Sequence, residues 1–341
     1  MATSHTTIKQ VAERAGVSTA TVSYVLNGTG TVTDETRRRV LSVVAELNYQ
    51  PRYAAQSLRG RSQTLGIPLM AAPERLADPV FAEVLAGFSD AAAQRGYYLL
   101  LAPVEPDADD VEVCLNLARS GRVDGLVLLD MRVDDPRALA LCQAGEPHVC
   151  AGPPPAGCHS PAVVVDTEAA AAQATTHLIG RGHHRIALIQ LPSELAESEP
   201  RYLGYAAALA AGGILVSPEL IVEAGRTEEH GYHAMQELLA AAEPPTAVLA
   251  CSDELAFGAL HALYDAGFEV GRDVSLIGFD DVPLAAHTIP PLTTLRQPRA
   301  QIGAELAALL DETIRNRRTA PRRITLEAHL MVRRSTGPPP G

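Results

Sequence analysis

The stretch of residues 7–58 constrains this chain most, because its apolar residues recur at helical spacing in three short runs. Thr7 and Gln10 match a capping box, which predicts that a first helix begins there. Gly16 permits a tight reversal of the backbone, and Ser18 is placed to cap a second helix directly after it. The pattern therefore predicts two short helices that pack against each other through a turn.

A third helix is predicted after Thr33, which can cap it, with a buried stripe of Val40, Leu41, Val44 and Leu47. Three such helices, with a glycine turn between the first two, are typical of a helix-turn-helix. Its second helix lies in the major groove of DNA. The outward side chains of that helix are small or neutral, which suits close approach to base edges. They are Thr19, Ala20, Thr21, Ser23 and Tyr24.

Charge is divided unevenly between this head and the rest of the chain. The net charge is −12, yet residues 1–62 hold eight Lys and Arg residues against four Asp and Glu residues. The head therefore carries +4 and the remainder −16. A basic module on an acidic body suits DNA binding at one end, because phosphate neutralisation needs only a local cationic face. A solvated charged surface would give the same count, so charge alone does not decide.

A short segment follows the head. Pro51 stands at a favourable first position for a helix, and the run ends at Leu58 and Gly60. A helix of this length is marginal by itself in water. We therefore expect this segment to fold only when it is docked on something.

The run VAERAGVSTATVSYVLNG, followed by ETRRRVLSVVAELNYQP and AAQSLR, resembles the head and hinge of the LacI/GalR family of bacterial repressors over residues 7–67. The resemblance implies that two hinge helices pair in the minor groove, where Leu58 wedges between base pairs and bends the DNA. Many members carry other residues at Ala20, Tyr24, Arg52 and Gln56, so the operator sequence stays open. The implied DNA-binding residues are Thr7, Ser18, Thr19, Ala20, Thr21, Ser23, Tyr24, Asn27, Thr31, Arg52, Ala55, Gln56 and Leu58.

After Gln63 the chain alternates strand-like and helix-like segments. Apolar runs such as YYLLLA, GLVLL, RIALIQL and VSLIGF predict buried strands, and the runs between them predict helices. This alternation indicates parallel sheets covered by helices on both faces. The pattern restarts at AVVVD, which predicts two lobes. A cleft would then lie at the carboxyl ends of their strands, where open α/β folds bind ligands.

The motifs DPVFAEVLAGF, HLIGRGHHRIALI, RYLGY, CSDELAFGAL and PPLTTLRQP extend the family resemblance over the body. They imply an α/β two-lobed, periplasmic-binding-protein-like effector domain behind an all-α helix-turn-helix DNA-binding domain with a hinge helix. The chain should cross between the lobes near Val163, Pro291 and Pro321. The expected boundaries are 1–50 for the head, 51–62 for the hinge helix and linker, and 63–341 for the effector-binding and dimerisation domain. The N-lobe would span about 63–163 and 292–320, and the C-lobe about 164–291 and 321–336.

Strand ends supply the candidate effector-binding residues. Asp280 follows VSLIGF and Arg201 opens RYLGY, and the resemblance implies that both hold polar groups of a small molecule. It also implies that Phe81 packs on the ligand and that Ser252 lines the cleft. Asp280 could instead cap a helix, and Phe81 could be a core residue. Sugar-responsive members often carry Asn and Asp where Ser252 and Gly152 stand here, and the chain has no Trp, which weakens a sugar assignment.

Other classes of site find little support. No GxSxG motif is present and no GxGxxG follows the first body strand, so we expect no enzyme activity and no cofactor. His183 and His184 are neighbours whose side chains diverge, so we expect no metal site. The five cysteines lack a CxxC pair and should be buried, reduced thiols, although Cys150 and Cys158 could bridge.

The two ends of the chain and its longest apolar runs bear on location. No apolar run reaches ~18 residues, the length of a membrane span, and the N-terminus lacks the order of a secretory signal. We therefore expect no membrane partner and a cytoplasmic location. The closing run GPPPG predicts a frayed tail.

Taken together, these patterns predict a ligand-responsive, sequence-specific transcriptional regulator. We expect a repressor that binds a pseudo-palindromic operator on double-stranded DNA as a homodimer, because one head buries too little DNA surface for tight specificity. A small-molecule effector, a sugar being one candidate, would act in the interlobe cleft. Two other classes stay open: a binding protein for uptake, which the body alone would suit, and an enzyme with a fused regulatory head.

Overall fold

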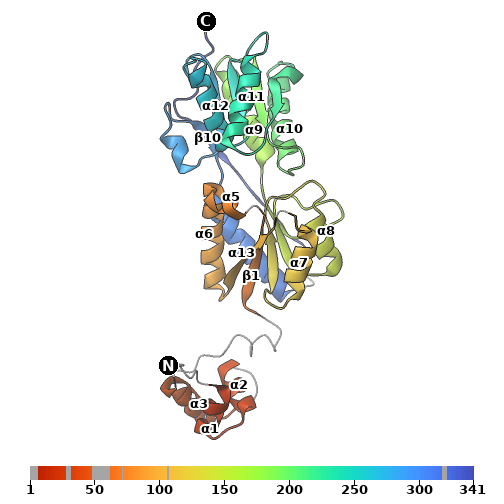
Figure 1. The fold of residues 1–341 in the computed structure, drawn as a ribbon, viewed down its shortest axis with the longest axis vertical. Helices are drawn as coiled ribbons and strands as arrows, with labels where there is room; N and C mark the ends of the chain where they lie inside the picture. The colour runs from red at the N-terminus through yellow and green to blue at the C-terminus, as the bar shows by residue number, and fades with distance from the viewer. Residues whose placement is uncertain (1–6, 28–31, 48–61, 71, 106, 317–320) are drawn as a thin grey trace. The chain divides into compact units, whose positions relative to one another are not determined.

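The computed structural model describes residues 7–27, 32–47, 62–70, 72–105, 107–316 and 321–341 (Figure 1). The chain divides into two compact units, Met1–Ser62 and Gln63–Gly341. None of the helices in these ranges is both long and apolar enough to span a membrane.

The described residues of the first unit form three helices, α1 (Ile8–Ala15), α2 (Thr19–Asn27) and α3 (Asp34–Glu46). The predicted capping box is confirmed, since the Thr7 hydroxyl accepts from the Gln10 amide and the Gln10 side chain accepts from the Thr7 amide. Gly16 ends α1 in the left-handed region, with φ of 63°. The three helices share a small apolar core of Val11, Ala12, Ala15, Val22, Val25, Val40 and Val43.

One prediction for α3 is wrong. Leu41, expected in the buried stripe, is 47% exposed, and Val43 is buried in its place. Val40, Val43 and Leu47 lie on one helical face at spacings of three and four residues, whereas Leu41 lies about 100° round from Val40. Val44 and Leu47 are partly buried and pack against this core, so Leu41 is the one residue of the predicted stripe that was misassigned.

The second unit contains two lobes, each built on a six-stranded sheet. In the first lobe the strand order is β11-β5-β4-β3-β1-β2, and all of the pairs are parallel. Its strands are β1 (Thr64–Met70), β2 (Tyr98–Val104), β3 (Gly125–Leu128), β4 (His148–Ala151), β5 (Ala162–Val165) and β11 (Arg323–Leu326). Its helices are α5 (Ala72–Ala77), α6 (Pro79–Gln94), α7 (Asp110–Arg119), α8 (Pro136–Ala144) and α13 (Arg299–Arg315), and α13 lies beside α6 (Figure 1).

The second lobe repeats this plan with the order β12-β10-β9-β8-β6-β7. Its strands are β6 (Ile186–Gln190), β7 (Ile221–Glu223), β8 (Ala247–Ala250), β9 (Ser275–Asp280), β10 (Thr293–Arg296) and the antiparallel edge strand β12 (His329–Met331). Its helices are α9 (Thr167–Gly180), α10 (Ser198–Ala211), α11 (Glu228–Leu239) and α12 (Asp253–Asp265), with short 3-10 turns at Pro218–Leu220 and Pro283–Ala286. The elements predicted as strands and helices of the two lobes are therefore present.

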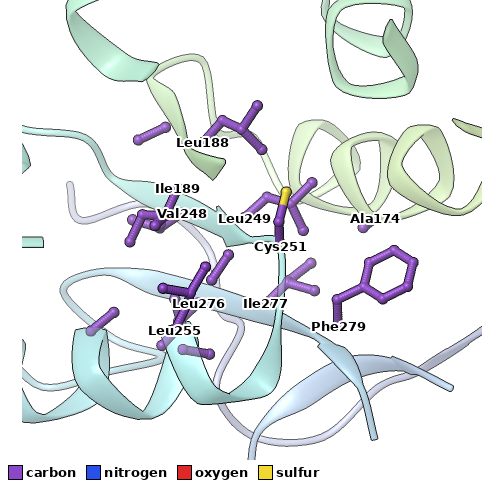
Figure 2. Packing of buried hydrophobic residues seen from close by; sticks show 14 of the residues in the cluster. Ala174, Leu188, Ile189, Val248, Leu249, Cys251, Leu255, Leu276, Ile277 and Phe279 are labelled. Atoms are coloured by element: carbon purple, nitrogen blue, oxygen red, sulfur yellow. The ribbon is translucent and has the colours of Figure 1, made fainter. Parts of the chain in front are cut away.

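The central strands of the second lobe are apolar on both faces, as a sheet covered by helices requires. Figure 2 shows strand residues such as Leu188, Leu249 and Ile277 packed with Ala174 of α9 and Leu255 of α12. All five are essentially inaccessible to solvent. This core fixes the carboxyl ends of β6, β8 and β9.

The predicted crossings between the lobes need correction. β5 pairs with β4 and β11 in the first lobe, so the second lobe begins after AVVV and not at residue 164. β10 pairs with β9 and belongs to the second lobe, although residues 292–320 were assigned to the first. β11 belongs to the first lobe, although residues 321–336 were assigned to the second. The lobe to which a strand belongs is set by its hydrogen bonds to neighbouring strands, and the pattern of apolar residues does not reveal those neighbours.

The end of the chain also differs from the frayed tail that was predicted. Gly337 is buried, its amide donates to the Ser275 hydroxyl at 2.9 Å, and its carbonyl lies 3.0 Å from His183 Nε2. His183 further contacts the Thr246 hydroxyl at 2.9 Å, so its ring joins the tail to the second sheet. Both ring nitrogens of His183 therefore take part in hydrogen bonds within the second lobe and to the tail.

Candidate functional site

A cavity of about 380 Å³ lies between the lobes. All four residues predicted to bind the effector line it: Phe81 from α6, Arg201 from α10, Ser252 ahead of α12 and Asp280 at the end of β9. The structure thus brings together residues that are up to 199 positions apart in sequence, from Phe81 to Asp280. Its volume is within the range of about 300–1,000 Å³ typical of small-molecule sites.

Asp280 is held at the end of its strand by a backbone with φ of 124°, a conformation that is rare for any residue except glycine. Its Oδ1 accepts a hydrogen bond from Gln297 Nε2 at 2.7 Å. No helix N-cap falls on Asp280, so capping does not explain this residue. Burial raises the pKa of its carboxyl group to about 6, and the nearby cations Arg201 and Arg299 limit that rise.

Arg201 is 3% exposed and is held on several sides. Nη2 donates to Glu197 at 2.6 Å, and Nη1 donates to the carbonyl of Cys251. The guanidinium stacks 4.0 Å from the centroid of the Phe279 ring. Its buried Nε has no hydrogen-bond partner within the described chain. Such an unpaired donor costs free energy unless another group accepts from it.

Ser252 and Phe81 have structural roles as well as positions on the cavity wall. The Ser252 hydroxyl accepts from the Leu255 amide at 3.1 Å and caps α12. Phe81 is 2% exposed, and the Arg75 guanidinium lies 5.5 Å from its ring centroid. Phe81 is therefore both a packed residue and part of the wall.

A group of ion pairs on the cavity wall was missed by sequence reasoning. Arg75 contacts Asp78 at 2.5 Å and Asp130 at 2.7 Å, all within the first lobe. Arg226 of the second lobe reaches the same Asp130 oxygen at 3.1 Å and so joins the two lobes. Asp130 follows a buried strand with φ of 50°, so the rule that nominated Asp280 could also have found it.

The residues after β10 were also missed as site residues, although their motif TTLRQP was noted. Gln297 directly follows β10, and its side chain donates to Asp280. Arg299 is 4% exposed; its Nε donates to Glu83 at 3.0 Å and its Nη2 to the Asp281 carbonyl at 3.0 Å. Its Nη1 is another buried donor without a partner among the residues described.

The adjacent carboxylates Asp280 and Asp281 have different surroundings. Asp281 pairs with Arg296 and with Arg333, each at 2.5 Å, and is not part of the cavity wall. Asp280 lines the cavity. Of the two neighbouring carboxylates, Asp280 therefore faces the cavity and Asp281 faces the two arginines.

In the head, Ser18, Thr19, Ala20 and Tyr24 are exposed, while Thr21 and Ser23 are half-buried. The Thr7 and Ser18 hydroxyls both accept from backbone amides at helix starts, Ser18 from Thr21 at 3.1 Å. Of the other predicted DNA-binding residues, Asn27 is described only as the last residue of α2. Thr31, Arg52, Ala55, Gln56 and Leu58 lie outside the described residues.

Comparison with known proteins assigns both units. A family model described as "Bacterial regulatory proteins, lacI family" matches residues 7–52, and one described as "Periplasmic binding protein-like domain" matches residues 175–336. The HTH-type transcriptional regulator AglR of Rhizobium meliloti is 40% identical over 98% of this chain and 95% of its own length.

Solved structures agree with this assignment. The complex of transcriptional regulator CelR with cellobiose has a TM-score of 0.76 and 36% identity, covering 97% of this chain and 100% of its own. The lac repressor dimer bound to operator and the anti-inducer ONPF has a TM-score of 0.83 and 28% identity, covering 98% and 100%. The chain belongs to the lacI family of bacterial regulatory proteins, and it is a DNA-binding transcriptional regulator with a two-lobed, periplasmic-binding-protein-like effector domain.

Proposed function

We propose that this regulator is a repressor that binds a pseudo-palindromic operator as a homodimer and responds to a neutral, hydroxyl-rich small molecule such as a saccharide. The observation that carries the ligand class is the mixed polarity of the interlobe cavity. Carboxylates accept hydrogen bonds only, and guanidinium groups donate only. A hydroxyl group does both, so a polyhydroxylated ligand can satisfy both kinds of wall.

The charge of the wall argues against an anionic ligand. Seven carboxylate residues and five arginines line the cavity, which leaves an excess of negative charge. Burial also raises the pKa of Glu254 and of Asp280 above their ordinary values, so extra negative charge in this space is unfavourable. Apolar residues such as Phe81, Met131 and Val165 supply surface for the C–H faces of a sugar ring. The cellobiose complex of CelR supports the same ligand class.

The proposal assigns separate tasks to the two units. Asp280, Arg201, Ser252 and Phe81 would contact the effector, and the exposed face of α2 would contact base edges in the major groove. A ligand that binds one lobe arrangement more tightly would shift the population of DNA-binding states. Two heads on one dimer would read two half-sites about one helical turn apart.

The test is a titration of operator affinity with saccharides, using the full chain and DNA selected by the protein from its genomic upstream regions. At least one saccharide that raises the thermal midpoint should change operator affinity by about 5- to 150-fold, the usual range of allosteric coupling. A saccharide that binds in an Asp280-dependent way yet leaves operator affinity unchanged would refute the regulatory coupling. Anionic ligands that bind more tightly than every saccharide would refute the ligand class.

The DNA-binding mode has its own prediction. Leu58→Ala should weaken specific operator binding by about 1–3 kcal/mol, because a lost apolar wedge gives up the contacts that a DNA bend permits. Non-specific binding, which depends on phosphate contacts, should be nearly unchanged. Fluorescence anisotropy on operator and on scrambled DNA at one salt concentration measures both. Equal losses on the two DNAs would contradict a wedge.

A further inference from the structure

A second, smaller cavity in the first lobe has chemistry of its own. Its volume is about 190 Å³, and it lies between α8, α13 and the segment that joins β4 to β5. Cys142, His148 and Ser160 line it. Cys158 lies directly beside Ser160 and is 6% exposed. None of these residues lines the interlobe cavity.

The two hydrogen bonds of His148 in this cluster have a definite direction. His148 Nδ1 lies 2.8 Å from the Glu146 carbonyl, which can only accept, so Nδ1 carries the proton. His148 Nε2 is then an acceptor, and the Ser160 hydroxyl at 2.5 Å donates to it. Ser160 Oγ lies 2.9 Å from the Cys158 sulfur, and with its own proton on His148 it can accept from the Cys158 thiol, for which the Ala138 carbonyl at 3.5 Å is a second acceptor. Burial lowers the pKa of His148, which keeps the ring neutral and able to accept a proton.

Two thiols flank the same hydroxyl group. Ser160 Oγ is 2.9 Å from Cys158 Sγ and 3.9 Å from Cys142 Sγ. Burial first, and then the neighbouring Cys142 thiol, raise the pKa of Cys158 to about 11, so this thiol is unreactive at rest. Cys142 is half-buried and faces the small cavity, whereas Cys150 is fully buried. An oxidant from solvent therefore meets Cys142 first.

We propose that Cys142 and Cys158 are a peroxide-sensitive pair that closes to a disulfide. Cys142 attacks a hydroperoxide, so that an S–O bond forms, the O–O bond breaks, and one water leaves when the oxidant is hydrogen peroxide. The Cys158 sulfur then attacks the Cys142 sulfenic acid; the S–S bond forms and the S–O bond breaks. The proton of Cys158 passes through Ser160 to His148 and leaves with the hydroxide as a second water. The sulfurs lose two electrons and the peroxide gains them.

The disulfide would act on a segment that reaches the interlobe cavity. The connection from β4 to β5 begins with Gly152 and Pro153, which line that cavity, and continues to Cys158. A bond from Cys158 to α8 would restrain this stretch of the wall. Oxidation therefore offers a second input to the cleft, separate from ligand binding.

Mapping of disulfides in the full-length protein tests the proposal. The reduced protein is treated with hydrogen peroxide, the remaining thiols are alkylated under denaturing conditions, and the peptides are analysed without reduction. We expect one cross-link, between the peptides of Cys142 and Cys158, that dithiothreitol reverses, while Cys114 and Cys251 stay alkylated. Failure of any cross-link to form, a Cys150–Cys158 link or a link between chains would overturn the assignment.

Variants test the proton path separately. Cys158→Ser should stop the reaction at a Cys142 sulfenic acid, which a dimedone probe traps. Ser160→Ala should slow disulfide closure by about tenfold or more, since a positioned proton relay contributes about 10²-fold or more. Ser160→Thr keeps the hydroxyl group and should restore the rate. Thermal unfolding shows that each variant is folded, and a folded Ser160→Ala that closes at the wild-type rate would overturn the relay.

Discussion

The two lobes share a sheet order but meet the cleft with different kinds of polar group. Both sheets follow one plan, with the first strand second from an edge, and they differ in the edge strand, which is parallel in the first lobe and antiparallel in the second. The second lobe presents buried groups, Asp280 and Arg201, each at most 9% exposed. The first lobe presents one buried cation, Arg299 of α13, and the pair Arg75 and Asp130, whose side chains are 16% and 29% exposed.

This difference implies a division of labour. Buried charged groups are already desolvated and fixed by their neighbours, so a ligand gains their full interaction when it binds. Partly exposed ion pairs are screened by water and contribute little. We infer that the second lobe determines affinity and that the first lobe adjusts closure.

The largest effect should follow removal of the buried carboxylate. Asp280→Ala should weaken effector binding by about 2–5 kcal/mol, because it removes a buried carboxylate from the cavity wall and leaves the half-buried Gln297 amide without this acceptor. Operator binding should persist, so the response to ligand is lost while repression remains. Calorimetry with a saccharide that shifts the thermal midpoint measures the first quantity, and anisotropy on operator DNA the second.

Asp281→Asn is the matched control for that change. It alters the adjacent carboxylate, which pairs with Arg296 and Arg333 away from the cavity wall. Asp281→Asn should lower the free energy of unfolding, and its effector affinity should stay within a few-fold of the wild-type value. If both variants lose the ligand equally, or Asp280→Ala still responds normally, the second lobe does not determine affinity in the way inferred.

The next two variants test a feature that the lobes share, a close contact between two helices at a glycine. Gly87 of α6 packs against α13, and a Cβ there would lie 2.0 Å from the Ala300 carbonyl oxygen. Gly258 of α12 packs equally closely against α11, where a Cβ would lie 1.9 Å from the Glu228 carbonyl oxygen. Backbone atoms cannot turn away, so Gly87→Ala and Gly258→Ala should each lower the free energy of unfolding by about 1–3 kcal/mol.

Urea unfolding of the full chain measures these losses. Gly180→Ala is the control, because a Cβ at Gly180 would meet no atom within 4 Å. It should cause no loss, and helix propensity favours a gain of up to about 1 kcal/mol. A loss in one lobe alone would show that the helix pairs of the two lobes do not depend on the same close contact.

The sequence predicted more of the fold than of the site. Helix starts at Thr7 and Thr33 were readable because capping is local chemistry. The lobe membership of β5, β10 and β11 was not, since strand pairing depends on partners far away in the chain. The two lobes are equally affected by this limit.

The cleft shows the same contrast. Asp280 was nominated because it directly follows an apolar strand run. Arg226 lies in a loop, Arg299 begins α13, and Gln297 follows the more polar strand run TTLR, so only the folded chain brings them to the cavity. The Ser160–His148–Cys158 cluster was missed for the same reason, because its members share no motif spacing.

A pH-dependent effect also belongs to the second lobe. Burial, and then the neighbouring Asp280, raise the pKa of Asp253 to about 8, against an ordinary value of 3.8. The folded state thus binds a proton that the unfolded state releases. The stabilisation from this proton is complete below about pH 3.8 and is lost as pH rises through about 8, at up to about 1.4 kcal/mol per pH unit.

Asp253→Asn mimics the protonated acid, with an amide that can still serve Thr294 and the Val282 amide. The free energy of unfolding of the wild type should therefore fall more steeply between pH 5 and 8 than that of the variant. Urea titrations of both proteins across this range measure the difference in slope. Parallel curves would mean that Asp253 is ionised in the folded protein.

The smallest effect concerns the ion pair that joins the lobes. Arg226→Gln removes the contact to Asp130 at 3.1 Å, but the Arg226 side chain is 46% exposed. Exposed pairs contribute about 0.2–1 kcal/mol, so effector affinity should change by less than about fivefold.

Arg75→Gln is the control, because Arg75 binds the same carboxylate from within the first lobe. If the cross-lobe contact adjusts closure, Arg226→Gln should speed effector dissociation in stopped-flow measurements, and Arg75→Gln should do so less. Added salt should shrink the difference, since it screens the wild-type pair. A loss for Arg226→Gln as large as that for Asp280→Ala would place the affinity in the contact between lobes rather than in the second lobe.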